Sequence, residues 1–387
     1  MRILRVATVP FFVLHHLRGQ IEFLVAAGHE VAVVASPVEG SDEIRRMEKV
    51  AFLPVAIARP IAPLRDLIAL VSLWRVMRQY RPQVVHSTTP KAGLLSAIAA
   101  ALAGVPVRIH TFTGQAWATR GGPVRWIARL ADRLIVKLNT RCYADSVSQR
   151  RFMTSEGICS ESEVEVLGSG SLAGVDLQRF DRQKLRPVTA SLRERHGIPA
   201  HARVICFVGR VTPDKGMVEL AAAFDTVARK VADAYLVIVG PVEPEHDPLP
   251  PAVAEALRTH GRIRMTGYDP EAERYLAMAD LLCLPSHREG FGNVVIEAAA
   301  LGVPTVGTRI DGLRDAVVDG VTGVLVPPKD SAALADALVG LLTDEARRKQ
   351  MGSAAQDRAR RLFDSRIVNG CVLKEYERLL AARRPGP

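Results

Sequence analysis

Short apolar runs alternate along the chain with longer segments whose apolar residues recur at helical spacing. In the first half, the short runs predict strands over Ile3–Val9, Glu30–Ala35, Val84–His86, Val107–Thr111 and Val164–Leu167. The longer segments predict helices over Leu17–Ala27, Leu64–Tyr80 and Ala92–Ala103. Strands that alternate with helices are typical of parallel sheets covered by helices on both faces.

The second half repeats this alternation. Strands are expected over Val204–Val208, Tyr235–Val239, Ile263–Thr266, Leu281–Leu284, Pro304–Gly307 and Gly323–Val326. Helices are expected over Val218–Val231, Pro251–His260, Glu271–Met278, Asn293–Leu301, Gly312–Val318 and Ser331–Leu342. The polar stretch Asp181–Arg203 separates the halves. We therefore expect an α/β protein with two doubly wound, Rossmann-like parallel-sheet domains that face a cleft. The first would span residues 1–187 and the second residues 188–365, with a final helix at about 366–383 that returns to the first.

Composition places the chain among ordinary globular proteins. Of 387 residues, 48% are hydrophobic and only 5% aromatic, so the core is expected to be aliphatic. The five cysteines are scattered and form no C-x-x-C pair, which argues against a zinc site or disulfide framework and for a reducing compartment. The N-terminus lacks the pattern of a signal peptide, and the longest apolar run, Ala97–Ala103, is shorter than the about 20 residues that a membrane span needs. A cytoplasmic protein is expected.

The excess positive charge lies in one half of the chain. The net charge is +10, and residues 1–187 hold 25 basic and 15 acidic residues, whereas residues 188–387 hold 26 of each. A nucleic acid, an anionic membrane surface or an anionic substrate would each account for this excess. No helix-turn-helix, RNP-type or zinc motif supports nucleic acid, which we do not expect as a partner. A dehydrogenase and a P-loop NTPase are disfavoured, because no G-x-G-x-x-G follows the first strand and no Gly-Lys pair occurs.

Two segments of the second half carry residues suited to a phosphorylated sugar. After the expected strand Leu281–Leu284, a tight loop with Gly290 and Gly292 leads into a helix that begins near Asn293. Glycines allow close backbone approach, free N–H groups at a helix start attract phosphate, and Glu289 and Glu297 can each accept hydrogen bonds from two hydroxyls. After Val204–Val208 come Arg210 and Lys215, which are suited to a diphosphate. Alternatively, these are an ordinary strand–helix turn and two solvated cations.

These two segments together resemble a known family. Gly-Arg-x-x-x-x-Lys-Gly at 209–216, followed by Glu-Gly-Phe-Gly-x-x-x-x-Glu at 289–297, is similar to family 4 of the retaining glycosyltransferases, which have the two-domain GT-B fold. Four further segments resemble the family at corresponding places: Ala27–Val31, Gly174–Phe180, Ala300–Pro304 and Asp319–Pro327. The resemblance therefore covers nearly the whole chain.

The resemblance implies roles for individual residues. Arg210 and Lys215 would bind the donor diphosphate and support the departing nucleotide, Glu297 would hold the ribose, and Glu289 would contact the transferred sugar. The remaining donor-binding positions would be Gly209, Gly290, Phe291, Gly292 and Asn293. The family implies no metal and no cofactor other than the nucleotide-sugar donor, and the chain contains no Asp-x-Asp. Charge on the leaving group would then be neutralised by Arg210, Lys215 and helix N-termini.

The first half departs from the family pattern. Its first loop, Pro10–Gly19, replaces the usual Gly-Gly, and the family's usual histidine after the fourth strand falls on Thr113. The segments Thr111–Thr119 and Gly168–Gly174 resemble a bacterial subgroup that builds capsule, O-antigen or glycoprotein glycans on a lipid diphosphate carrier. Candidates for contact with the acceptor are His16, His86, Lys91, His110, Thr113, Gly114 and Gln115.

Basic residues recur every four positions in one segment of the first half. If Val124–Cys142 is helical, Arg125, Arg129, Arg133, Lys137 and Arg141 form one stripe, with Trp126 on the apolar side. Such a helix suits an anionic membrane surface; alternatively it is an ordinary amphipathic helix with a solvated basic face. The helix Leu64–Tyr80, with Trp74, is expected to belong to the core.

The leading hypothesis is a retaining glycosyltransferase that uses a UDP-sugar, an N-acetylhexosamine or related hexose. Its expected acceptor is a polyprenyl-diphosphate-linked glycan at the inner face of the bacterial plasma membrane, with which the protein would associate peripherally. A nucleotide-sugar epimerase or hydrolase on the same fold is the enzymatic alternative, and a basic nucleic-acid-binding protein is the alternative of another class.

Overall fold

The computed structural model describes residues 1–119, 121–243 and 247–383. The chain divides into two compact units, of which the first joins Met1–Gly174 to the C-terminal segment from Ser365 and the second is Val175–Asp364. The first unit thus ends before the expected boundary at 187. The physical reason is that Val175 bridges to Asp364 and its N–H donates to the Phe363 carbonyl at 2.7 Å, which fixes residues from 175 onward in the second unit.

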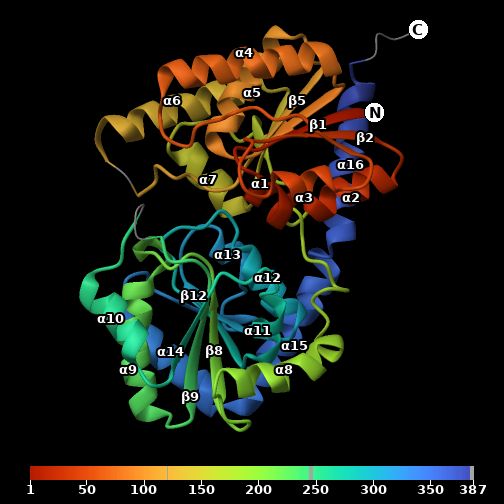
Figure 1. The fold of residues 1–387 in the computed structure, drawn as a ribbon. Helices are drawn as coiled ribbons and strands as arrows, with labels where there is room; N and C mark the ends of the chain where they lie inside the picture. The colour runs from red at the N-terminus through yellow and green to blue at the C-terminus, as the bar shows by residue number, and fades with distance from the viewer. Residues whose placement is uncertain (120, 244–246, 384–387) are drawn as a thin grey trace. The chain divides into compact units, whose positions relative to one another are not determined.

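A parallel seven-stranded sheet forms the centre of the first unit (Figure 1). Its strands are β1 (Arg2–Val6), β2 (Glu30–Val34), β3 (Val50–Phe52), β4 (Val84–Ser87), β5 (Val107–Phe112), β6 (Arg141–Ala144) and β7 (Val164–Glu165). They lie in the order β3-β2-β1-β4-β5-β6-β7, and every neighbouring pair is parallel. The reversal of order beside β1 places the carboxyl ends of β1 and β4 next to each other, where open sheets of this kind bind ligands.

Helices cover both faces of this sheet. One face carries α1 (Pro10–Phe12), the π-helical turn Val13–Leu17, α2 (Arg18–Ala26), α3 (Ser41–Arg45) and α16 (Ser365–Ala381). The other carries α4 (Pro63–Tyr80) and α5 (Pro90–Leu102), with α6 (Gly122–Leu138) beside α5. The helix α7 (Val147–Ser155) contacts β6. Successive side chains of β1 explain the two layers, because Ile3 is buried toward α2 and α16, and Leu4 toward α4 and α5.

The second unit has a parallel six-stranded sheet in the order β10-β9-β8-β11-β12-β13. Its strands are β8 (Arg203–Val208), β9 (Ala234–Val239), β10 (Ile263–Gly267), β11 (Leu281–Leu284), β12 (Thr305–Thr308) and β13 (Gly323–Val326). On one side of this sheet lie α9 (Met217–Lys230), α10 (Pro251–Thr259) and α14 (Ser331–Thr343); on the other lie α8 (Arg182–Arg195), α11 (Glu273–Met278), α12 (Asn293–Ala300) and α15 (Glu345–Leu362) (Figure 1). The short α13 (Leu313–Ala316) precedes β13.

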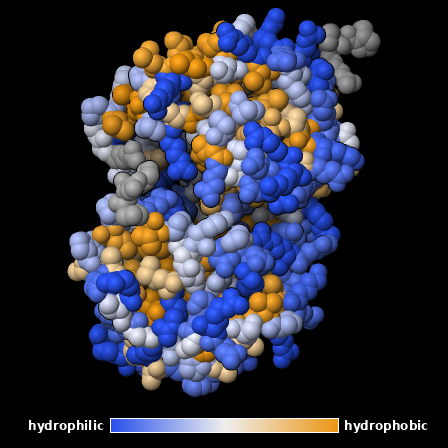
Figure 2. All heavy atoms as spheres, viewed as in Figure 1, coloured by the Kyte–Doolittle hydropathy of each residue, from blue (hydrophilic) through white to orange (hydrophobic). Residues whose placement is uncertain are grey.

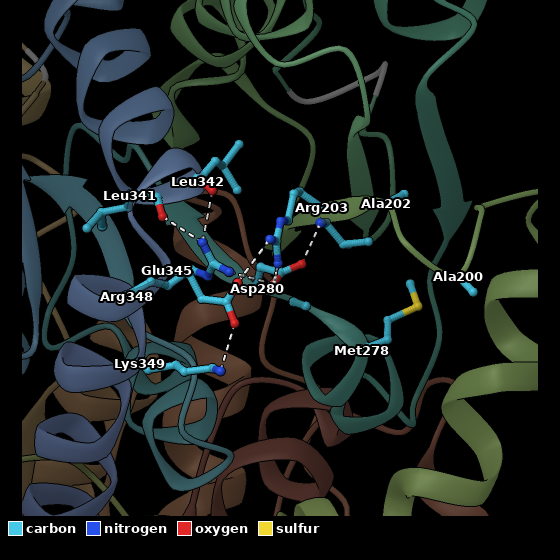
Figure 3. Close-up of polar contacts among 12 residues, drawn as sticks. Ala200, Ala202, Arg203, Met278, Asp280, Leu341, Leu342, Glu345, Arg348 and Lys349 are labelled. Carbon is cyan, nitrogen blue, oxygen red and sulfur yellow. Dashed lines mark hydrogen bonds and ion pairs between the residues drawn. The ribbon is translucent and has the colours of Figure 1, made fainter.

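An acidic residue ties three elements together where the strands of the second sheet begin (Figure 3). Asp280, just before β11, accepts a hydrogen bond from the Val204 N–H at 2.9 Å, and its other oxygen lies 3.5 Å from the buried guanidinium of Arg348. Arg348 also donates to the carbonyls of Leu341 and Leu342 in α14. This network fixes the edge opposite the carboxyl ends of the strands, and so holds the sheet that carries the loops described below.

Several local predictions were wrong. The polar stretch 181–203, which was expected only to separate the halves, contains α8, and this helix buries Leu192 and packs on α11. The first loop, 10–19, is helical and includes the π-helical turn. The segment 124–142 is not one helix, because α6 ends at Leu138 and Arg141 begins β6. Strand β3 and helix α15 were not predicted at all.

Candidate active site

The loop after β8 brings two cations to the carboxyl edge of the second sheet. Gly209 follows the strand, and the 3-10 turn Pro213–Lys215 leads into α9 through Gly216. Gly216 has φ of 74°, and a Cβ there would lie 2.1 Å from the carbonyl oxygen of Pro285. A side chain is therefore excluded at this position, and the loop lies directly against the end of β11.

Lys215 and Glu289 meet across these two loops. The Lys215 ammonium lies 2.6 Å from Glu289 Oε1, and the Ser286 hydroxyl donates to the same oxygen at 2.8 Å. Both charged side chains are mostly buried, with 18% and 14% of their surface exposed. The resemblance assigned one to the diphosphate and the other to the transferred sugar, and the structure places the two side chains in direct contact.

Arg210 lies in a mixed cluster of charges. Its guanidinium is 3.1 Å from Glu243 Oε2 and 3.4 Å from Asp214 Oδ2. Asp214 is also 3.4 Å from Arg288 and accepts a hydrogen bond from the Thr212 hydroxyl. Burial opposes ionisation of Asp214, but the Thr212 hydrogen bond and the charges of Arg210, Lys215 and Arg288 outweigh it and lower its pKa. Three cations thus gather on one ionised carboxylate, an arrangement suited to an anionic ligand.

In the loop between β11 and α12, close packing leaves no room for a side chain at the glycine that precedes the helix. Gly292 has φ of 85°, and a Cβ there would lie 2.7 Å from the Leu313 side chain. Gly312 approaches the loop so closely that a Cβ would lie 2.8 Å from the carbonyl oxygen of Glu289. Phe291 is buried against Phe363, with ring centroids 5.2 Å apart. The loop is therefore held in shape by packing, and α12 begins at Asn293 with its first N–H groups at the same edge as Lys215.

Glu297 lies one turn into α12. Burial raises the pKa of its carboxyl to about 7; the Arg179 charge lowers it, and the Glu273 charge raises it further. Arg179 does not neutralise Glu297 directly, because its guanidinium is paired with Glu273 at 2.8 Å. The predicted ribose ligand is therefore a carboxyl that titrates near neutrality in the free protein.

Two of the three histidines predicted to contact the acceptor, His86 and His110, are internal residues of the first unit. His86 is buried, with Nδ1 2.6 Å from the Tyr376 hydroxyl and Nε2 2.8 Å from the Thr111 hydroxyl. His110 is buried beside Gly93, where a Cβ would lie 2.3 Å from its ring, and its Nδ1 is 2.9 Å from the Ser87 hydroxyl. Burial lowers the pKa of His110 to about 3 and that of His86 well below its usual value. Burial therefore favours the neutral form of both rings, with Tyr376 of α16 against His86 and Gly93 of α5 against His110.

Two other acceptor candidates are also engaged within the first unit. The Lys91 ammonium pairs with Asp66 at 2.8 Å and donates to the carbonyl of Pro60, so it links the starts of α5 and α4. His16 lies on the π-helical turn with its ring centroid 4.9 Å from that of Phe12. Lys91 is thus already paired, which the isolated sequence motif did not indicate.

The loop after β5 remains a candidate for contact with the acceptor, and one of its residues, Gln115, contacts Gln149 of α7. Thr113 and Gly114 are partly exposed, and Gln115 is buried, with Oε1 accepting from Gln149 Nε2 at 3.2 Å. Gln149 Oε1 in turn accepts from the N–H of Asp145, just after β6. Within the described ranges, Gln115 Nε2 and Asp145 Oδ1 are buried without a hydrogen-bond partner. Burial raises the pKa of Asp145 to about 8.

Asp145 is a candidate that sequence reasoning missed. It follows β6, a strand that was not predicted and whose first two residues fall in the segment 124–142 considered as a helix, so its position at the sheet edge was not visible. Asp214 and Glu243 were missed as well. Asp214 stands four residues after Arg210, which was an available signal, whereas Glu243 follows another strand and only the sheet order reveals its contact.

The predicted basic stripe is not a free basic surface. Arg125 and Arg129 pair with Glu156 at 2.9 and 3.4 Å, and Arg133 donates to the carbonyl of Gly157. Arg141 lies in β6 and pairs with Glu165 at 2.8 Å. Lys137 and Trp126 remain exposed on α6. The stripe is therefore divided: Arg125 and Arg129 turn toward Glu156 at the end of α7, whereas Arg133 and Lys137 are exposed.

The described residues contain no cluster of three or more His, Cys, Asp or Glu side chains that could hold a metal ion. No helix within the described ranges is long and apolar enough to cross a membrane.

The two doubly wound parallel-sheet units define the class of GT-B proteins. One of these units carries two cations and a glycine-containing loop at the carboxyl edge of its sheet. Family models agree: "Glycosyl transferase 4-like domain" matches residues 14–170, and "Glycosyl transferases group 1" matches residues 188–358. The capsular polysaccharide biosynthesis glycosyltransferase CapM of Staphylococcus aureus is 30% identical over 91% of this chain and 90% of its own length. The chain therefore belongs to the glycosyltransferases of the GT-B fold that resemble capsule and glycan enzymes.

Further relatives extend this similarity. The UDP-Gal:alpha-D-GlcNAc-diphosphoundecaprenol alpha-1,3-galactosyltransferase of Escherichia coli is 26% identical over 76% of this chain and 75% of its own. Among solved structures, Anabaena HepE in complex with UDP and glucose matches with a TM-score of 0.80 at 18% identity, over 98% of this chain and all of its own (100%). These matches confirm the predicted fold and the predicted resemblance.

Proposed function

We propose that this chain is a retaining, family 4 glycosyltransferase that transfers a sugar from a UDP-sugar to a polyprenyl-diphosphate-linked acceptor in bacterial surface-glycan assembly. The transferred sugar is an N-acetylhexosamine or a related hexose. The proposal is carried by one observation: Lys215, Arg210 and Glu289 converge beside the start of α12. The diphosphoundecaprenol named for the E. coli relative supports the kind of acceptor.

The donor side assigns one role to each element. Arg210 and Lys215 bind the diphosphate, and the N–H groups at the start of α12 add partial positive charge. Glu289 accepts from hydroxyls of the sugar after Lys215 turns to the phosphate, and Glu297 accepts from the ribose diol. In the reaction, the bond between the anomeric carbon and the diphosphate oxygen breaks, and its electron pair leaves with UDP. A hydroxyl oxygen of the acceptor forms the new bond on the same face, and its proton passes to the departing diphosphate oxygen.

Charge neutralisation by protein groups implies transfer without a divalent metal. The Arg210 guanidinium, the Lys215 ammonium and the start of α12 stabilise the negative charge that develops on the departing UDP. We expect transfer to continue unchanged in excess EDTA. Loss of transfer on chelation, with recovery on adding Mg²⁺ or Mn²⁺, would contradict this part of the proposal.

The test uses purified full-length protein, a polyprenyl-diphosphate-linked N-acetylglucosamine and a panel of UDP-sugars, with GDP-mannose as the base control. Mass spectrometry should show one sugar added to the acceptor, and NMR of the product should show the anomeric configuration of the donor. Inversion would overturn the retaining assignment. Release of free or epimerised sugar at the same rate without acceptor would favour a hydrolase or epimerase instead.

A further inference from the structure

Helices α4 and α6 expose large apolar side chains to solvent. On α4, Leu64, Leu67 and Ile68 are 79%, 58% and 66% exposed; on α6, Trp126, Ile127 and Leu130 are 65%, 48% and 48% exposed. We call these six residues the apolar α4–α6 surface. The α4 residues belong to the helix that was expected to be part of the core. One apolar face of α4 is buried, as expected, and a second apolar face is exposed to solvent. The buried face of α4 is formed by Ala69, Leu73 and Met77.

The two helices lie on the same side of one sheet. Helix α5 packs against both α4 and α6, so the exposed faces flank a single layer within the first unit (Figure 1). Figure 2 shows hydrophobic side chains gathered over α4 in that view. Leu102, at the end of α5, is also 69% exposed. Soluble proteins rarely expose contiguous apolar areas of this kind without a function, so this layer requires a partner.

The charges around this surface identify the kind of partner. Arg65, Arg75 and Arg78 are exposed on α4, and Arg133 and Lys137 on α6. The two acidic residues of these helices are both occupied, because Asp66 pairs with Lys91 and the buried Asp132 accepts from the Trp117 indole. The layer therefore combines apolar side chains and cations without a free carboxylate on either helix. An anionic lipid surface has the complementary chemistry, apolar below and negatively charged at the headgroups.

We propose that the apolar α4–α6 surface binds an anionic lipid bilayer, with both helices lying in the interface and inserting their apolar side chains among the lipids. The sequence prediction instead assigned membrane contact to the basic stripe and its neighbour, which are Arg125, Trp126, Arg129, Arg133, Lys137 and Arg141. Because Arg125 and Arg129 are paired with Glu156, lipid contact is made by the opposite, apolar side of α6. The proposed function supplies only the reason for membrane binding, which is access to a lipid-borne acceptor. In that respect the inference rests on the proposed function.

Flotation with vesicles tests this surface without donor or acceptor. The full-length protein should float with phosphatidylglycerol-containing vesicles and much less with pure phosphatidylcholine vesicles. The variants Leu64→Ser/Leu67→Ser/Ile68→Ser and Trp126→Ser/Ile127→Ser/Leu130→Ser should each need at least about ten-fold more lipid for half-maximal binding. As a matched control, Tyr268→Ser/Val321→Ser removes exposed apolar residues of the second unit and should bind as the wild type does.

Two readouts separate the possible outcomes. Unchanged flotation of both α4 and α6 variants, or no flotation of the wild type, would overturn the proposal. A wild-type dimer in solution that these variants convert to monomer, with no lipid binding, would assign the surface to a second copy of the chain. Transfer to a short-chain, water-soluble acceptor should be equal in variants and wild type, so failure of the proposed activity would appear in that assay and not in flotation.

Discussion

The Lys215 ammonium lies 2.6 Å from a Glu289 carboxylate oxygen, although the two residues are 74 positions apart in the sequence. In the free protein, therefore, a cation predicted to bind phosphate is already paired with the carboxylate predicted to bind sugar. Under the proposed function, replacing Lys215 with Ala removes a contact with the diphosphate and leaves Glu289 without its cation, so that its charge repels the donor.

For Lys215→Ala, we expect kcat/KM to fall at least about 100-fold, which corresponds to about 2.7 kcal/mol of transition-state stabilisation. Steady-state assays with a saturating acceptor measure this change, and circular dichroism checks the fold. The matched control is Lys230→Ala, which removes an exposed pair with Asp336 in the same unit and should leave kcat/KM unchanged. Wild-type activity of Lys215→Ala would refute the assigned role.

Glu243 pairs with Arg210 in the free protein and partly neutralises its charge. Because a diphosphate must compete with this carboxylate, Glu243→Gln should strengthen UDP binding several-fold in isothermal titration calorimetry. Glu255→Gln, which alters an exposed pair with Arg258, provides the control and should not change the affinity. Weaker UDP binding by Glu243→Gln would show instead that Glu243 positions Arg210 for the donor.

The raised pKa of Glu297, about 7, predicts how donor binding varies with pH. A ribose diol donates to the ionised carboxylate, and the ionised fraction falls as pH drops below about 7. The donor KM should therefore rise between pH 7.5 and 5.5 in the wild type. In Glu297→Gln, KM should be higher throughout and less dependent on pH; an equally steep dependence in this variant would assign the titration to another group.

Asp145 should make the protein less stable as pH rises. Burial raises its folded-state pKa to about 8, above the 3.8 of an exposed aspartate, so the folded state favours the neutral carboxyl. The stability this contributes is complete below pH 3.8 and is lost as pH rises through 8. Asp145→Asn keeps a neutral group, so thermal unfolding should show its Tm rising relative to wild type from pH 5 to pH 8. A constant difference would contradict the buried, raised-pKa carboxyl.

Asp280 should be more important for stability than an exposed acid. Asp280→Ala leaves the buried Arg348 without its carboxylate and Val204 N–H without its acceptor. We expect a loss of about 3 kcal/mol, measured as a lower urea midpoint for the second unit. Asp336→Ala, which removes an exposed partner of Lys230, should shift this midpoint little. Equal shifts for the two variants would argue against the network.

Sequence patterns predicted most of the α/β framework because burial imposes strong periodicity on strands and on the helices packed against them. They failed where exposure weakens that signal. Helix α8 is mostly polar and was interpreted only as the break between the halves, and Leu192 is its buried residue. Strand β6 was hidden because Arg141 continues the four-residue spacing of the arginines on α6, although the helix ends at Leu138.

By itself, the sequence determined the alternation that builds two parallel sheets and the donor motif that places Arg210, Lys215, Glu289 and Glu297 near strand ends. These features are local, because they depend on side-chain spacing and on turns that need glycine. Only the tertiary structure decided which charges pair and which helix faces remain exposed. Periodicity shows that α4 and α6 have distinct faces, but strand order and packing determine that Leu73 of α4 and Ile135 of α6 turn inward and that Leu64 and Trp126 meet solvent.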